Sequence, residues 1–237
     1  DDGVGEILDK LDELELAQNT LVIYTSDQGF FLGEHGWFDK RFMYEESYQM
    51  PFLCRYPGKI PSGIKSSDIA CNVDFASTFL DYAGISIPKY MQGVSIRPVL
   101  EGKTPNNWEQ LGYHRYWMHN DEIHEAWAHY GVRDQHYKLI YWYNKDLDQL
   151  GARPNDAPPE WELFDCDADP NELINLANNE KYKKVFKKML AKLDKKMKEI
   201  GDIPEHNSEK VLISLNNSFE KKSFLKKSQK FRNNNET

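Results

Sequence analysis

The fold of this chain is decided by a short stretch that reads Leu21-Val-Ile-Tyr-Thr-Ser-Asp-Gln-Gly29. Its apolar, β-branched and aromatic beginning is typical of a buried strand. Residues 4–17 place apolar side chains near helical spacing and predict an amphipathic helix before that strand. A helix, a short loop and a buried strand favour an α/β sheet with helices on its faces. Ligands bind at the carboxyl ends of strands in such sheets, and Asp27 and Gln28 stand at this one.

The same patterns predict the remaining elements and a division of the chain. Strands are expected at 51–56, 129–133, 137–143 and 161–165, helices at 72–83 and 180–200, and a short element at 94–100. Aromatic and histidine residues become crowded after residue 111. We therefore expect a main domain over 1–110, a small antiparallel subdomain with a helix over 111–201, and a weakly ordered tail over 202–237.

Composition and charge exclude several classes of protein. Hydrophobic residues make up 40% of the 237 residues, too many for a disordered chain, and no apolar run is long enough to span a membrane. Residues 1–180 carry 31 acidic and 14 basic residues, a net charge of −17, which argues against a nucleic-acid partner. Residues 181–198 hold nine lysines and one acid. Such a basic amphipathic helix can lie on an anionic membrane or enter calmodulin, although a surface helix with solvated lysines is the default.

The candidate metal-binding and anion-binding residues follow the first strand closely. Asp27 and the Gln28 carbonyl are suitable ligands for a hard cation. Lys40 in the same pocket would meet an anionic oxygen of a phosphate or sulfate, and His35 could bind that anion or carry a proton. Together these residues predict an anion site beside a metal.

Three motifs in this segment resemble a known family. Thr-Ser-Asp-Gln-Gly at 25–29, Gly-Glu-His-Gly at 33–36 and Asp-Lys-Arg at 39–41 are similar to the second half of the catalytic domain of type I sulfatases. These are the formylglycine-dependent branch of the alkaline phosphatase superfamily. The resemblance continues through 50–58, 73–95, 130–140 and 161–172, and covers about residues 1–201. It implies part of an alkaline-phosphatase-like mixed sheet flanked by helices, followed by a small antiparallel sheet packed with a helix.

The resemblance assigns roles to individual residues. Asp27 and Gln28 match the pair that completes the calcium site, where the family more often has Asn or His at the second position. Lys40 matches the lysine that binds the sulfate and stabilises the negative charge on the leaving oxygen. His35 lies in the same wall and is expected to touch the sulfate or the sugar.

The same comparison suggests a subgroup and a substrate. Asp39, Lys40 and Arg41 are most like those of sulfatases that remove a 6-O-sulfate from N-acetylglucosamine-type sugars, where Asp39 and Arg41 would hydrogen-bond sugar hydroxyls. Histidines also recur every five residues at 114, 119, 124 and 129. They could form a metal cluster, a loop of polar aromatics or a wall of the substrate cleft. On the last reading, His119 and His129 are expected to contact the glycan.

The family's nucleophile motif, Cys/Ser-x-Pro-x-Arg, occurs nowhere in the 237 residues. We therefore expect the C-terminal portion of a longer sulfatase, inactive alone, with formylglycine supplied by the missing part and one Ca²⁺ bound. The partner would be a sulfated carbohydrate, and the family implies a periplasmic, secreted or lysosomal location, with no signal peptide in this chain. Two alternatives stay open. One is a phosphatase or phosphonate hydrolase of the same superfamily, and the other is a non-catalytic glycan-binding relative.

Overall fold

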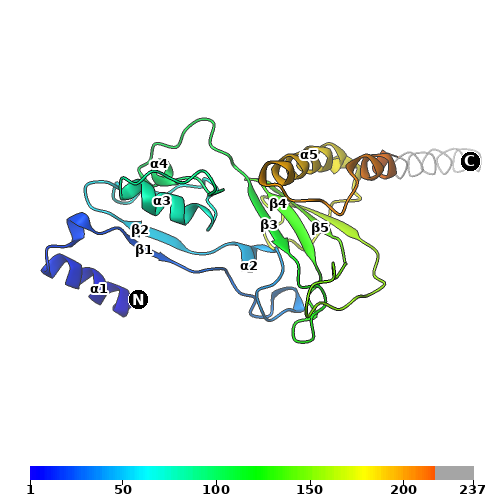
Figure 1. Cartoon of the computed structure of the whole chain (residues 1–237), viewed down its shortest axis with the longest axis horizontal. Coiled ribbons are helices and arrows are strands. Elements are labelled where there is room, and N and C mark those ends of the chain that lie inside the picture. Colours follow the sequence, from blue (N-terminus) through cyan, green and yellow to red (C-terminus); the bar gives the residue numbers. More distant parts are fainter. Residues whose placement is uncertain (217–237) are drawn as a thin grey trace, which may run out of the picture. The chain divides into compact units, whose positions relative to one another are not determined.

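A computed structural model describes residues 1–216 of the chain (Figure 1). It divides into two compact units, one over Asp1–Gly112 and a second beginning at Tyr113. Within the described residues, none of the helices is both long enough and apolar enough to cross a bilayer.

The first unit is built around a two-stranded antiparallel sheet. Strand β1 (Val22–Thr25) pairs with β2 (Phe52–Arg55) so that Tyr24 faces Leu53. The segment between the strands contains a single 3-10 turn, η2 (Glu34–Gly36), and a one-turn helix, α2 (Glu45–Tyr48). The unit also contains α1 (Asp2–Glu13), η1 (Ala17–Asn19), α3 (Asp74–Tyr82) and α4 (Arg97–Leu100).

The second unit is a four-stranded sheet in the order β3-β4-β5-β6. Its strands are β3 (Gly112–Tyr116), β4 (His129–Arg133), β5 (Tyr137–Trp142) and β6 (Glu160–Asp165). The pairs β4–β5 and β5–β6 are antiparallel. Val132, Leu139 and Leu163 are fully buried in the centre of this sheet.

One long helix follows the sheet and packs on β4 and β5 (Figure 1). After the turn η3 (Glu180–Tyr182), α5 (Lys183–Ile200) buries Phe186, Met189, Leu190, Leu193 and Met197. It ends at Gly201, which adopts the left-handed conformation that favours glycine after a helix.

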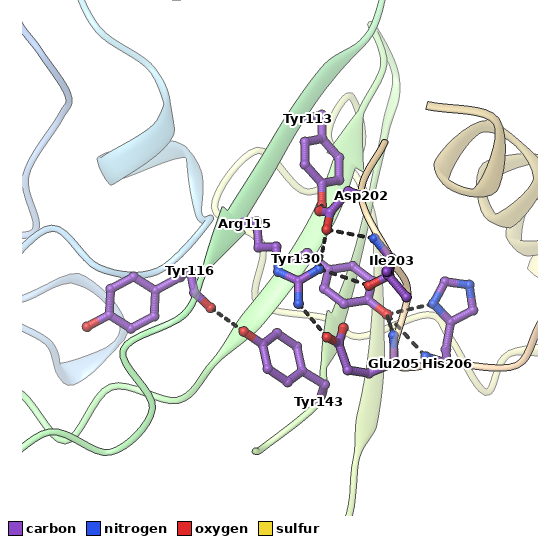
Figure 2. A network of polar contacts seen from close by, with 9 residues as sticks. All are labelled: Tyr113, Arg115, Tyr116, Tyr130, Tyr143, Asp202, Ile203, Glu205 and His206. Atoms are coloured by element: carbon purple, nitrogen blue, oxygen red, sulfur yellow. Dashed lines mark hydrogen bonds and ion pairs between the residues drawn. The ribbon is translucent and has the colours of Figure 1, made fainter. Parts of the chain in front are cut away.

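The segment after α5 is attached to the sheet by a polar network centred on Arg115, shown in Figure 2. The Arg115 guanidinium pairs with Asp202 at 2.7 Å and with Glu205, and only 4% of its side chain is exposed. It also lies over the rings of Tyr130 and Tyr143. The Tyr130 hydroxyl and Nδ1 of His206 are 2.7 Å apart. These contacts fix residues 202–206 against β3 and β4.

The fold class expected from the sequence, α/β with a small C-terminal antiparallel sheet and a helix, is confirmed. The strands expected at 129–133, 137–143 and 161–165 correspond to β4, β5 and β6, with ends that differ by at most one residue. Strand β3 and helix α2 were not expected, and α1 ends at Glu13 rather than near residue 17. Of the expected tail, residues 202–206 make defined contacts and 208–216 are helical, while 217–237 lie outside the described residues.

Candidate active site

Asp27 and Gln28 lie two and three residues after Thr25, the last residue of β1. The Ser26 hydroxyl donates to the Gln28 carbonyl at 2.9 Å and to a carboxylate oxygen of Asp27 at 3.2 Å. Three residues at the strand end are therefore held in one tight turn. The carboxylate of Asp27 leaves this turn toward solvent, with 77% of its side chain exposed.

The Gln28 side chain is oriented by two groups that lie far along the chain. Its Nε2 donates to the main-chain carbonyl of Lys40 and to Oγ of Ser47. Ser47 is buried, and its hydroxyl donates to the same Lys40 carbonyl at 3.1 Å. Among the described residues, Oε1 of Gln28 has no donor, so this oxygen is available as a ligand.

Lys40 brings a positive charge to the end of β1. Its Nζ lies 3.6 Å from Oδ2 of Asp27. The nearby ammonium lowers the pKa of the Asp27 carboxyl, with a further contribution from the Ser26 hydroxyl. Asp27 is therefore an anionic oxygen donor at neutral pH.

The return of the chain toward β1 depends on a close main-chain approach at Gly29. Its N–H donates to the Ser47 carbonyl at 2.9 Å. A Cβ at this position would lie 2.0 Å from the Glu46 carbonyl oxygen, a distance that excludes every residue but glycine. Farther along, the Phe31 N–H donates to the Asp39 carbonyl at 2.7 Å, and the Phe31 side chain is fully buried.

His35 occupies a strained backbone position in the same segment. Its φ of 53° lies in the left-handed region, which costs a non-glycine residue on the order of 1–3 kcal/mol. The ring stacks on Tyr44 with centroids 4.5 Å apart, and Nε2 lies 3.5 Å from a carboxylate oxygen of Glu46. Two neighbours thus hold the imidazole in one orientation. A strained backbone conformation of this kind persists only where neighbouring contacts hold the residue in place.

Asp39 and Arg41 flank Lys40 and contact each other. Nε of Arg41 lies 3.2 Å from Oδ2 of Asp39, with 28% and 15% of the two side chains exposed. A carboxylate and a guanidinium in this arrangement can accept and donate hydrogen bonds to neighbouring hydroxyls.

His119 and His129 belong to the second unit, and both are buried. His119 accepts a hydrogen bond from the Ala128 N–H at 3.0 Å, and His129 donates from Nδ1 to the Trp127 carbonyl at 2.8 Å. Burial lowers the pKa of both rings, that of His129 to about 3. His124 is more accessible, with 25% of its side chain exposed and Nδ1 2.8 Å from Asp121. Among the described residues, none of these histidines belongs to a group of three potential metal ligands.

The first unit therefore brings together Asp27, Gln28 and Lys40, as the sequence predicted from one strand end. The carboxylate and carboxamide oxygens of Asp27 and Gln28 are the hard donors that Ca²⁺ prefers, so the residues present fit a calcium ion. Sequence reasoning did not find Ser47 or Glu46. Each acts through a contact across many residues, and neither stands in a motif that could have indicated it.

Known proteins match this chain over most of its length. The family model described as "N-sulphoglucosamine sulphohydrolase, C-terminal" matches residues 33–199. The N-acetylglucosamine-6-O-sulfatase of Bacteroides thetaiotaomicron is 45% identical over 90% of this chain and 36% of its own length. Human arylsulfatase K is 33% identical over 94% of this chain and 38% of its own length. The chain thus spans little more than a third of these relatives.

A solved structure of the protein BT4656, in complex with its substrate D-glucosamine-2-N,6-O-disulfate, matches with a TM-score of 0.76. It is 44% identical, and the match covers 84% of this chain and 38% of that one. The resemblance inferred from the motifs at 25–41 is confirmed by these matches. The chain belongs to the sulfatase family, and within it to the group defined by the C-terminal part of N-sulphoglucosamine sulphohydrolase.

Proposed function

We propose that this chain forms part of a sulfuric ester hydrolase that removes sulfate from a sulfated glycan. The observation that carries the proposal is the placement of Lys40 Nζ 3.6 Å from Asp27, beside the oriented carboxamide of Gln28. A sulfate ester needs a cation on its anionic oxygens and stabilisation of the charge that develops on the leaving oxygen. We assign both tasks to Lys40, which would bind a sulfate oxygen and stabilise the charge on the leaving oxygen.

The metal proposed for this site is one calcium ion, held by Asp27 and Gln28. The sulfatase family generally uses Ca²⁺ and formylglycine. When bound, the cation polarises sulfate oxygens as a Lewis acid. In this chain Ser47 positions Gln28, and the charge of Lys40 favours the ionised form of Asp27. We assign His35 to a hydrogen bond with a sulfate or sugar oxygen.

The substrate we propose is a 6-O-sulfated glucosamine unit. It is supported by the N-acetylglucosamine-6-O-sulfatase that is 45% identical and by the substrate in the solved complex of BT4656. Asp39 and Arg41 are assigned to sugar hydroxyls because their side chains pair beside Lys40 and stay partly exposed. The assignment of glycan contacts to His119 and His129 remains a prediction. A periplasmic, secreted or lysosomal location accords with a sulfated glycan as substrate.

The test is sulfate release by the complete enzyme, expressed with its formylglycine-generating partner. N-acetylglucosamine-6-sulfate and a matched 6-phosphate are the substrates, and Lys40→Ala is the variant. We expect the wild type to prefer the sulfate and Lys40→Ala to lose about 10²–10³ in kcat, as removal of a charge-stabilising donor does.

Lys65→Ala is the matched control, because this exposed lysine lies in the same unit and outside the site. It should keep full activity. Faster release of phosphate than of sulfate would favour the phosphatase alternative. Glycan binding without any release of sulfate would favour a non-catalytic relative.

A further inference from the structure

The turn η3 and the solvent face of α5 carry a row of lysines. Lys181 in η3 and Lys184, Lys188, Lys195 and Lys198 in α5 are all exposed. Their spacings of three, four, seven and three residues place them on one face of a helix. At 1.5 Å per residue, the row from Lys184 to Lys198 extends about 21 Å.

Most of these ammonium groups are not neutralised by the part of the chain that the structure describes. In residues 1–216, Lys181, Lys184, Lys188 and Lys198 form no ion pair, and Lys195 lies 3.5 Å from Glu199 with 72% of its side chain exposed. By contrast, Lys192 at the edge of the helix pairs with Asp134 at 2.5 Å. The row is therefore a concentration of uncompensated positive charge in a chain whose net charge is −8.

The packing of α5 excludes two uses of a basic amphipathic helix. Insertion into a membrane surface or into a peptide-binding groove requires an accessible apolar face. The apolar face of α5 is occupied by the sheet, and Phe186, Met189 and Leu193 are at most 2% exposed. Only the lysine face is available to a partner, so the partner must be recognised by charge.

We propose that this lysine row binds a sulfated polysaccharide chain, a proposal that rests on the proposed sulfatase function for its choice of polyanion. A linear polymer with regularly spaced sulfates matches a linear row of ammonium groups about 21 Å long, as point charges that need no fixed bidentate geometry. The acidic remainder of the chain repels a polyanion elsewhere on its surface. The row would hold substrate polymer near the enzyme without taking part in hydrolysis.

The test measures binding of heparin, a sulfated polysaccharide, to the full 237-residue chain at several salt concentrations. The variant replaces Lys181, Lys184, Lys188 and Lys198 by Gln, which removes charge and keeps helix propensity. We expect heparin binding to weaken about tenfold or more at low ionic strength and to depend less steeply on salt. Circular dichroism of the variant verifies that the helix is intact.

A matched control replaces Lys59, Lys65 and Lys89, three exposed lysines of the first unit, by Gln, and it should bind heparin like the wild type. Equal heparin binding by the wild type and the helix variant would overturn the proposal. So would tighter binding to duplex DNA or to phosphatidylserine vesicles than to heparin. The lysine-row variant of the complete enzyme should still hydrolyse N-acetylglucosamine-6-sulfate. Lys40→Ala should still bind heparin. The two variants therefore test the two proposals independently.

Discussion

At the scale of single residues, the segment between β1 and α2 depends on main-chain groups that approach one another closely. Gly29 allows the backbone to touch the carbonyl of Glu46, and His35 accepts a left-handed conformation because Tyr44 and Glu46 hold its ring. The same approach places Ser47 against the Gln28 amide. The geometry around Asp27 and Gln28 therefore depends on residues far along the chain from them.

Substitution of Gly29 by Ala tests that dependence. The added methyl would overlap the Glu46 carbonyl oxygen at 2.0 Å, so we expect the free energy of unfolding to fall by about 1–3 kcal/mol or more. Urea denaturation measures the change. Gly3→Ala is the control, because a Cβ there meets no atom within 4 Å and the position is helical. It should be neutral or slightly stabilising, and an equal loss in both variants would contradict the explanation.

At the scale of elements, residues 202–206 behave as an extra layer on the sheet because Arg115 is paired with two of their carboxylates. Arg115→Met should leave Asp202 and Glu205 without their cation and cost about 3–5 kcal/mol. It should also open this segment to protease. Limited proteolysis with mass spectrometry locates the cleavage. Arg153→Met is the matched control, since Arg153 is 45% exposed and its pairing with Glu125 is long at 3.7 Å. Cleavage unchanged from wild type in Arg115→Met would show that other contacts hold the segment.

The elements that sequence patterns predicted are those with a simple burial pattern. The central strands β4 and β5 are continuous buried runs, and the helix α5 buries apolar residues at helical spacing. Strand β3 was missed because its residues Tyr113 to Tyr116 read as polar aromatics. Arg115 is buried by the rings of Tyr130 and Tyr143 and by carboxylates almost ninety positions later, which no local pattern indicates. The residues of the candidate site likewise fall into those that a local sequence pattern predicted and those that it did not. A strand end and its neighbours predicted Asp27, Gln28 and Lys40, while Ser47 and Glu46 depend on contacts that no local pattern carries.

At the scale of the whole molecule, two buried histidines make stability depend on pH. Burial lowers the pKa of His114 to about 4 and that of His129 to about 3, from an ordinary value of 6.5. Below pH 6.5 these two histidines bind protons in the unfolded chain but stay neutral in the folded chain. The free energy of unfolding therefore decreases as the pH falls from 6.5 toward 4. By pH 5 the loss should be about 2 kcal/mol for each histidine.

Urea denaturation of the wild type at pH 7 and pH 5 measures this dependence. His129→Gln should be less stable at pH 7 and should lose part of the pH dependence. His136→Gln is the control, because His136 is 63% exposed and pairs with Asp167 at the surface. An identical pH dependence in wild type and His129→Gln would rule out His129 as its source.

The hydrogen bond that orients Gln28 ends on the main chain of residue 40, not on its side chain. The two properties of that position, an anchor for the Gln28 carboxamide and a positive charge beside Asp27, therefore come from different groups of one residue. A library of side chains at position 40 would vary the charge while the main-chain anchor stays in place. A single codon change can thus alter the electrostatics at the end of β1 without loss of the hydrogen bond that orients Gln28.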